Sequence, residues 1–138
     1  MKTKVLLIIM GVTLFALGSA LYRQESDDSS TQALDAVKRI IKQSCGVTGC
    51  HSGKYPAANL NLEPEKFPTS AAGVLSLGMP DLKIVDPGAP EKSYLLAKVR
   101  GASGIVGKRM PMNRDPLTEE QIRRIEEWIK SLAGNSPF

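Results

Sequence analysis

Three stretches of the chain carry apolar residues at helical spacing. Between residues 31 and 45, Leu34, Val37 and Ile41 recur at intervals of three and four positions, with polar residues between them. This period predicts an amphipathic helix that ends at Cys45.

The other two stripes have clear boundaries. The segment EKSYLLAKVR lies between Pro90 and Gly101, residue types that favour the start and the end of a helix. Near the C-terminus, Thr118 and Gln121 have the spacing of a capping box, and Ile122 opens an apolar repeat behind them. We therefore expect a second helix over 90–100 and a third that begins after Thr118.

Long loops separate these helices. Residues 52–89 and 101–117 are rich in Pro, Gly, Asn and Ser and show no sustained period. The best strand candidate is the short run Leu82–Val85. The pattern predicts an all-α domain of three to four short helices. Loops of this length in a small domain usually have a function, such as enclosing a bound group.

The N-terminus is typical of an export signal. Lys2 and Lys4 precede an apolar run over 5–22 that contains the small residues Gly18 and Ala20. We expect cleavage after Ala20, although a run of 18 residues is also long enough to remain as a membrane anchor. The predicted organisation is a signal peptide or anchor over 1–20, a polar linker over 21–31, one domain over 32–134 and a tail over 135–138, placed in the periplasm or otherwise outside the cytoplasm.

The charge balance argues against a nucleic-acid partner. The formal net charge is +4, and removal of the first 20 residues would take away Lys2 and Lys4. The remaining basic residues form no clustered run of the kind that binds nucleic acid.

The motif CGVTGCH, residues 45–51, combines two thiols with the only histidine of the chain. Covalent haem attachment uses C-x-x-C-H, in which the thiols bond to the haem vinyl groups and the histidine binds the iron. Here the spacing is C-x4-C-H, and the longer insert requires backbone freedom that Gly46 and Gly49 can supply. The motif predicts that Cys45, Cys50 and His51 hold a haem.

Two other interpretations of the motif remain open. An oxidising compartment permits a disulfide between Cys45 and Cys50, which would stabilise a small exported domain. A zinc site is weaker, because the chain has no further Cys or His to act as a fourth ligand beside Cys45, Cys50 and His51.

Four segments in order carry a family resemblance. CGVTGCHSG, AANLNL, IVDPGAPEKSYLLAKVRG and GKRMPMNRDPLTEEQIRRIEEWIKSLAG together resemble the single-haem cytochrome c-like domains of exported bacterial proteins, over about residues 32–134. The resemblance implies a cytochrome c-like fold in which the first and last helices pack together around one covalently bound haem c.

The resemblance also implies a sixth iron ligand. Met110 matches the methionine of the family's R-M-P segment, while Met112 and Met79 remain alternatives. Pro87 could place a carbonyl against the His51 ring, and Arg109 could pair with a haem propionate. The apolar pocket candidates are Leu60, Leu62, Tyr94, Leu95 and Trp128.

A haem iron held by both His51 and Met110 has no position left for a substrate. The expected function is therefore single-electron transfer between redox partner proteins, with no small-molecule substrate and no enzymatic activity. Two alternatives stay open. One is a five-coordinate haem enzyme or gas sensor. The other is a haem-free protein-interaction module that is stabilised by a Cys45–Cys50 disulfide.

Overall fold

The computed structural model describes residues 30–134. The predicted signal peptide or anchor, almost all of the linker and the tail lie outside these residues. A compact unit begins at Ala33. Within the described residues, none of the helices is both long enough and apolar enough to cross a membrane.

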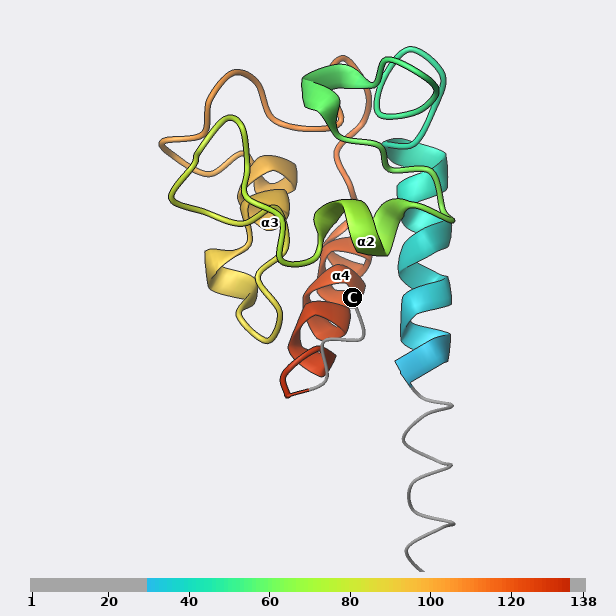
Figure 1. Cartoon of the computed structure of the whole chain (residues 1–138), viewed down its shortest axis with the longest axis vertical. Coiled ribbons are helices and arrows are strands. Elements are labelled where there is room, and N and C mark those ends of the chain that lie inside the picture. The colour runs from blue at the N-terminus through green and yellow to red at the C-terminus, as the bar shows by residue number, and fades with distance from the viewer. Residues whose placement is uncertain (1–29, 135–138) are drawn as a thin grey trace, which may run out of the picture. The chain divides into compact units, whose positions relative to one another are not determined.

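Helices account for the regular structure of residues 30–134. Residues 30–44 are helical, which confirms the prediction of a helix that stops at Cys45. The further elements are the 3-10 helix η1 (Ala57–Asn59), α2 (Phe67–Ala71), the 3-10 helix η2 (Pro90–Lys92), α3 (Tyr94–Arg100) and α4 (Glu119–Ser131), as Figure 1 shows. In this part of the chain β-structure is limited to isolated bridges, two of which involve Lys83 and one Val85. The all-α class is confirmed.

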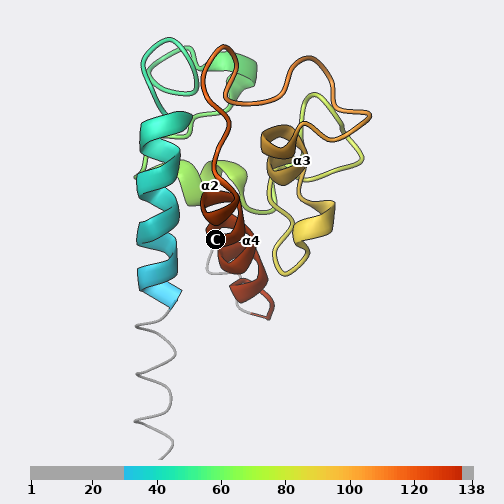
Figure 2. The same cartoon turned by 180° about the vertical axis from the view of Figure 1, so that it is seen from behind.

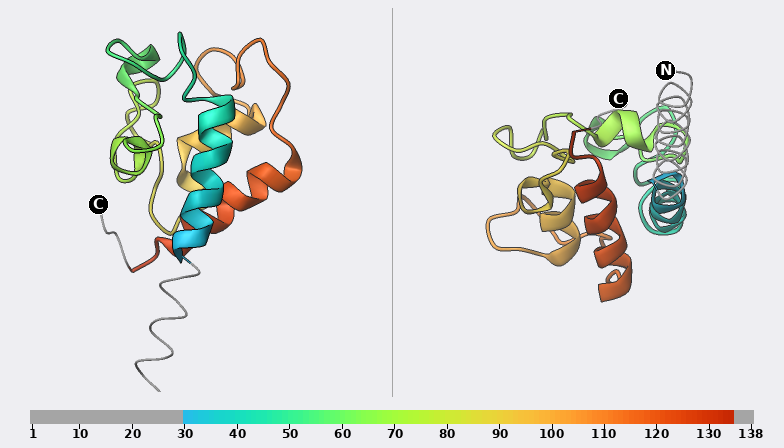
Figure 3. Two further views of the ribbon diagram at one scale, coloured as in Figure 1. Left: turned by 90° about the vertical axis from the view of Figure 1, so that its right-hand side faces the viewer. Right: turned by 90° about the horizontal axis from the view of Figure 1, so that it is seen from below.

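The helix over 33–44 and α4 run in opposite senses (Figures 1 and 2). The end of the first and the start of the second therefore lie toward the same end of the domain, where the loops after Cys45 and before Thr118 are found (Figure 3). A hydrogen bond joins the two regions, since Arg114 Nη1 donates to the carbonyl oxygen of Gln43 at 3.4 Å. Segments far apart in the sequence thus meet beside Cys45.

Side chains from all the α-helices and from two loops form one hydrophobic cluster. The first helix supplies Val37, Ile40 and Ile41, and α4 supplies Ile122, Ile125, Trp128 and Ile129. Other buried members are Cys45, Leu62, Phe67, Ala71, Ile84, Val85, Leu95, Leu96, Val99, Leu117 and Leu132. The first helix, α2, α3 and α4 therefore share one hydrophobic core.

Helix α2 was not predicted from the sequence. Its first residue, Phe67, is fully buried, and its ring lies 5.1 Å from that of Trp128 with a tilt of 41°. Pro68 occupies the first turn, where a proline removes no intrahelical hydrogen bond. The helix thus depends on the burial of Phe67 rather than on a long apolar stripe.

The predicted second helix is divided at Ser93. Its hydroxyl accepts from the Asp86 N–H at 2.9 Å and donates to the Ala89 carbonyl at 3.0 Å, and the residue has extended backbone angles. As a result, η2 ends before Ser93 and α3 begins after it. Gly101 ends α3 in the left-handed region, at φ 67°, as its position predicts.

The predicted start of α4 is confirmed. The Thr118 hydroxyl accepts from the Gln121 N–H at 3.2 Å, and the Gln121 side chain accepts from the Thr118 N–H at 2.9 Å. Leu117 and Ile122, which flank this box, are both buried. The helix is therefore fixed at its first turn by both polar and apolar contacts.

Removing the Phe67 ring tests the role of α2. Because the ring is fully buried against Trp128, we expect Phe67→Ala to lower the free energy of unfolding by about 3 to 5 kcal/mol. Thr69→Ala, at an exposed position of the same helix, should change it by less than about 0.5 kcal/mol. Urea unfolding of both variants measures the difference, and equal midpoints would contradict the proposed docking of α2.

Candidate functional site

The motif CGVTGCH forms a closed loop at the end of the first helix. The N–H groups of Cys45 and Gly46 both donate to the Ile41 carbonyl at 2.8 Å, which ends the helix. Six residues after Cys45, the His51 N–H donates back to the Cys45 carbonyl at 3.2 Å. The chain therefore returns to its starting point, and the histidine lies beside the first cysteine.

The four inserted residues are accommodated by a tight turn. The Cys50 N–H donates to the Val47 carbonyl at 3.0 Å, and Gly49, the third residue of this turn, has φ 82°. A positive φ at that position is required by type II turns and favours glycine. The prediction that Gly49 supplies backbone freedom is confirmed.

Gly46 is needed for a different reason. A Cβ atom at this position would lie 2.3 Å from the Leu62 carbonyl oxygen, so no side chain fits without a shift of the backbone. Its φ is not in the left-handed region, which corrects the expectation that it supplies a positive φ. The glycine instead allows the close approach of a loop from later in the sequence.

Both cysteines are free thiols with unlike surroundings. Cys45 is buried, with 6% of its surface exposed, whereas Cys50 is exposed. Burial raises the pKa of the Cys45 thiol from 9.0 to about 11, the nearby Cys50 raises it further, and the positive charge of Arg114 opposes both effects.

The His51 ring is oriented by two backbone carbonyls. Its Nδ1 lies 3.1 Å from the Ala57 oxygen and 3.2 Å from the Leu60 oxygen. Because carbonyl oxygens only accept, Nδ1 carries the hydrogen, and the neutral ring then has its lone pair on Nε2. Within residues 30–134 no hydrogen bond occupies Nε2, so this nitrogen is the one available to a metal ion.

The carbonyls that orient the ring differ from the predicted one. The sequence suggested Pro87, whereas the structure assigns this contact to Ala57 and Leu60, in the AANLNL segment. Sequence reasoning missed them because they act through backbone atoms, which a pattern of side chains does not reveal. The segment is nearer in sequence to His51 and folds back over it.

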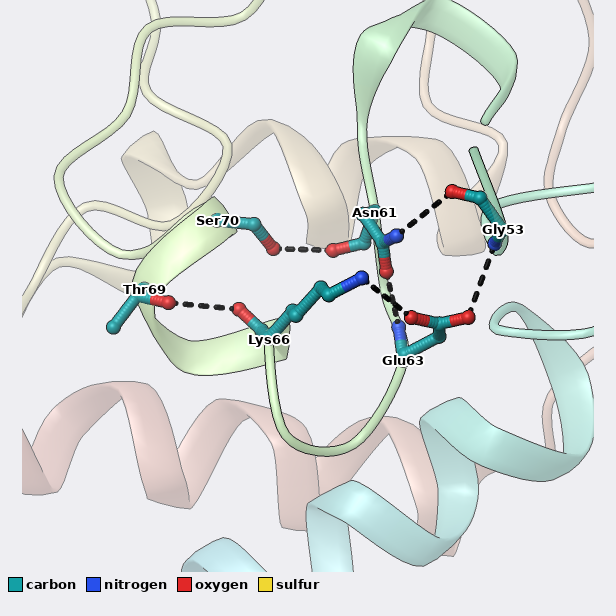
Figure 4. Close-up of polar contacts among 6 residues, drawn as sticks. All are labelled: Gly53, Asn61, Glu63, Lys66, Thr69 and Ser70. Atoms are coloured by element: carbon teal, nitrogen blue, oxygen red, sulfur yellow. Dashed lines mark hydrogen bonds and ion pairs between the residues drawn. The ribbon is translucent and has the colours of Figure 1, made fainter. Parts of the chain in front are cut away.

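A polar network holds this returning segment (Figure 4). Glu63 accepts from the Gly53 N–H at 3.0 Å and from Lys66 Nζ at 2.9 Å, while Asn61 Nδ2 donates to the Gly53 carbonyl at 3.2 Å. The Ser70 hydroxyl donates to the Asn61 carbonyl. The hydrogen bond from Lys66, followed by that from Gly53, lowers the pKa of the Glu63 carboxyl.

Met110 lies in the second loop, over 101–117. It is half-buried, its N–H donates to the Lys98 carbonyl at 2.9 Å, and its peptide bond to Pro111 is cis. Met112, two residues later, is 50% exposed, and Met79 is half-buried in a separate loop. The Gln43–Arg114 contact places the loop of Met110 beside the end of the first helix, directly before Cys45.

Arg109 has an unsatisfied buried nitrogen. Its Nη1 is buried and has no hydrogen-bond partner among the described residues. The aliphatic part of the side chain lies across Gly101, where a Cβ would be 3.0 Å from Arg109 Cδ. A buried guanidinium nitrogen without a partner is costly, so the site favours an anionic group that accepts from it.

The apolar pocket candidates fall into two groups. Leu62, Tyr94, Leu95 and Trp128 are buried, and Leu60 is partly buried against the core. The large apolar side chains that remain exposed within residues 30–134 all lie in loops: Tyr55, Val74, Leu75, Leu77, Val106 and Met112. The loops that carry Met79 and Met110 thus present apolar surface that the core does not cover.

Among the described residues, no group of three His, Cys, Asp or Glu side chains could hold a metal ion. Comparison of the chain with protein-family models, with curated proteins and with solved structures finds no match.

The buried thiol predicts a pH dependence of stability in protein made without haem attachment. Above pH 9 the unfolded chain loses the Cys45 proton, whereas the folded chain retains it up to about pH 11. The unfolded state then binds fewer protons, so stability is unaffected by this group below pH 9 and falls by about 3 kcal/mol as the pH rises to 11.

Urea unfolding at a series of pH values measures this loss. Cys50→Ala removes only the smaller contribution of its thiol to the raised pKa of Cys45, so it should lose slightly less stability than the wild-type chain between pH 9 and 11, whereas Cys45→Ala should lose the least. Identical alkaline profiles for all three proteins would show that Cys45 is not buried as described.

Proposed function

We propose that this chain is an exported monohaem c-type cytochrome that carries single electrons between redox proteins. The haem would be bonded to Cys45 and Cys50, with His51 and Met110 as the axial ligands of its iron. The proposed fold is cytochrome c-like, with the loops around one covalent haem c.

The observation that carries the proposal is the state of His51. A ligating histidine usually donates its other ring N–H to a carbonyl or carboxylate, which fixes the tautomer and the ring orientation. Here Nδ1 donates to backbone carbonyls and Nε2 is available, directly after the second of two cysteines that a tight turn brings together. The hydrogen bonds of the ring therefore support the proposal that His51 is an iron ligand.

The remaining residues fit the same cofactor. Arg109 offers a buried guanidinium nitrogen to a propionate, and the exposed apolar side chains of the loops offer surface to a macrocycle. Met110 supplies a soft thioether that favours Fe(II) and raises the reduction potential. The chemistry that haem supplies when bound is reversible one-electron transfer at its iron.

A second candidate is a haem-free interaction module. The favouring observation is the hydrophobic cluster, in which side chains of the first helix, α2, α3 and α4 pack against one another. In an oxidising compartment the thiols of Cys45 and Cys50 would then form a disulfide. The two candidates differ in covalent mass.

Intact mass under denaturing conditions separates them. Expressed with a haem-maturation system on the export side of the membrane, the chain should gain the mass of one haem and lose that of a cleaved signal peptide. Cys50→Ala should carry its haem through at most one thioether bond. A mass without haem and short by two hydrogens would establish the disulfide instead and contradict the cytochrome proposal.

The methionine ligand is tested by spectroscopy of the haem-loaded protein. Met110→Leu should abolish the absorption signature of a thioether bound to iron, lower the reduction potential and speed the binding of carbon monoxide to the reduced protein. Met112→Leu and Met79→Leu are the controls and should keep the wild-type spectrum. Loss of the signature in either control would transfer the ligand role to that residue, and fast carbon monoxide binding by the wild type would favour the five-coordinate alternative.

A further inference from the structure

The side chain of Lys98, in α3, binds the loop over 101–117 at two points. Lys98 Nζ donates to the Val106 carbonyl at 2.8 Å and to the Lys108 carbonyl at 2.6 Å. An ammonium group has three donors, so a single side chain can satisfy two carbonyls of a segment that is otherwise irregular. Hydrogen bonds from a charged donor are also stronger than those between neutral groups.

The backbone of the same residue makes a third contact with the loop. The Lys98 carbonyl accepts from the Met110 N–H at 2.9 Å. Lys98 therefore binds residues 106, 108 and 110, which alternate along the loop. The last of these contacts is at the residue proposed to bind the iron.

Tyr94 supports the start of this segment. Its hydroxyl oxygen accepts from the Val106 N–H at 2.9 Å, and the residue lies one helical turn before Lys98, on the same face of α3. Tyr94 is buried, with 8% of its surface exposed. One face of α3 thus determines where the loop runs.

We infer that Lys98 is a positioning residue that holds the 106–110 segment so that Met110, and not Met112, binds the haem iron. The inference rests on the proposed function. A methionine side chain has three rotatable bonds, so its sulfur is placed only if its backbone is fixed. The backbone of Met110 is hydrogen-bonded to α3, whereas Met112 lies beyond the last hydrogen bond between the loop and α3 and is 50% exposed.

Amide hydrogen exchange of the secreted full-length protein, as isolated, tests the attachment of the loop. Lys98→Met keeps the length of the side chain and removes its donors, and we expect the Val106 and Met110 amides to exchange about 10-fold faster or more. Lys92→Met removes an exposed lysine from η2 and should leave both amides unchanged. Unchanged exchange in Lys98→Met would overturn the inference.

Carbon monoxide binding and the thioether absorption of the haem-loaded protein test the ligand role. In Lys98→Met we expect carbon monoxide to bind the reduced protein about 10-fold faster and the thioether signature to weaken, with Lys92→Met like the wild type. If Lys98→Met does not fold, Tyr94→Phe should show the same changes in smaller degree.

The outcomes distinguish the two proposals. A wild-type protein without haem would overturn the cytochrome proposal and the ligand role together. A wild-type protein with haem, combined with fast amide exchange but unaltered carbon monoxide binding in Lys98→Met, would overturn the ligand role alone.

Discussion

The candidate site depends on the position of Leu62, which is fixed by three contacts at once. Its N–H donates to the His51 carbonyl at 2.7 Å, and its own carbonyl lies so near Gly46 that no Cβ fits there. Its side chain is 2% exposed and belongs to the hydrophobic core. The loop that orients the histidine is therefore anchored to the core through Leu62.

Local signals in the sequence were sufficient for the elements that local contacts determine. The capping box at Thr118, the left-handed stop at Gly101 and the helix that ends at Cys45 all follow from residues within one or two turns of each other. The type II turn at Gly49 belongs to the same class. These predictions needed no knowledge of the tertiary structure.

The features that sequence reasoning missed depend on residues far apart in the chain. Helix α2 has five residues and too short a stripe to show a period, and its stability comes from Phe67 against Trp128. Gly46 is required by a carbonyl 16 positions later, and the division between η2 and α3 follows from contacts of Ser93 with the preceding loop. The pattern of residue types along a sequence contains no signal for contacts between distant segments. The short helices within residues 52–89 were therefore not predicted.

The two loops proposed to hold the iron are supported in unequal ways. The loop of His51 is tied to the core through Leu62 and closed by the network around Glu63. The loop of Met110 contacts the helices mainly through hydrogen bonds of its backbone and side chains, and it contributes Pro111 and Leu117 as its buried residues.

Segments held by few buried apolar contacts open at lower free energy than the core does. In the proposed cytochrome, local opening would therefore release the thioether of Met110 while the imidazole of His51 stays in place. This difference between the loops of His51 and Met110 follows from the contacts that each loop makes with the rest of the domain. It does not require the two bonds to the iron to differ in strength.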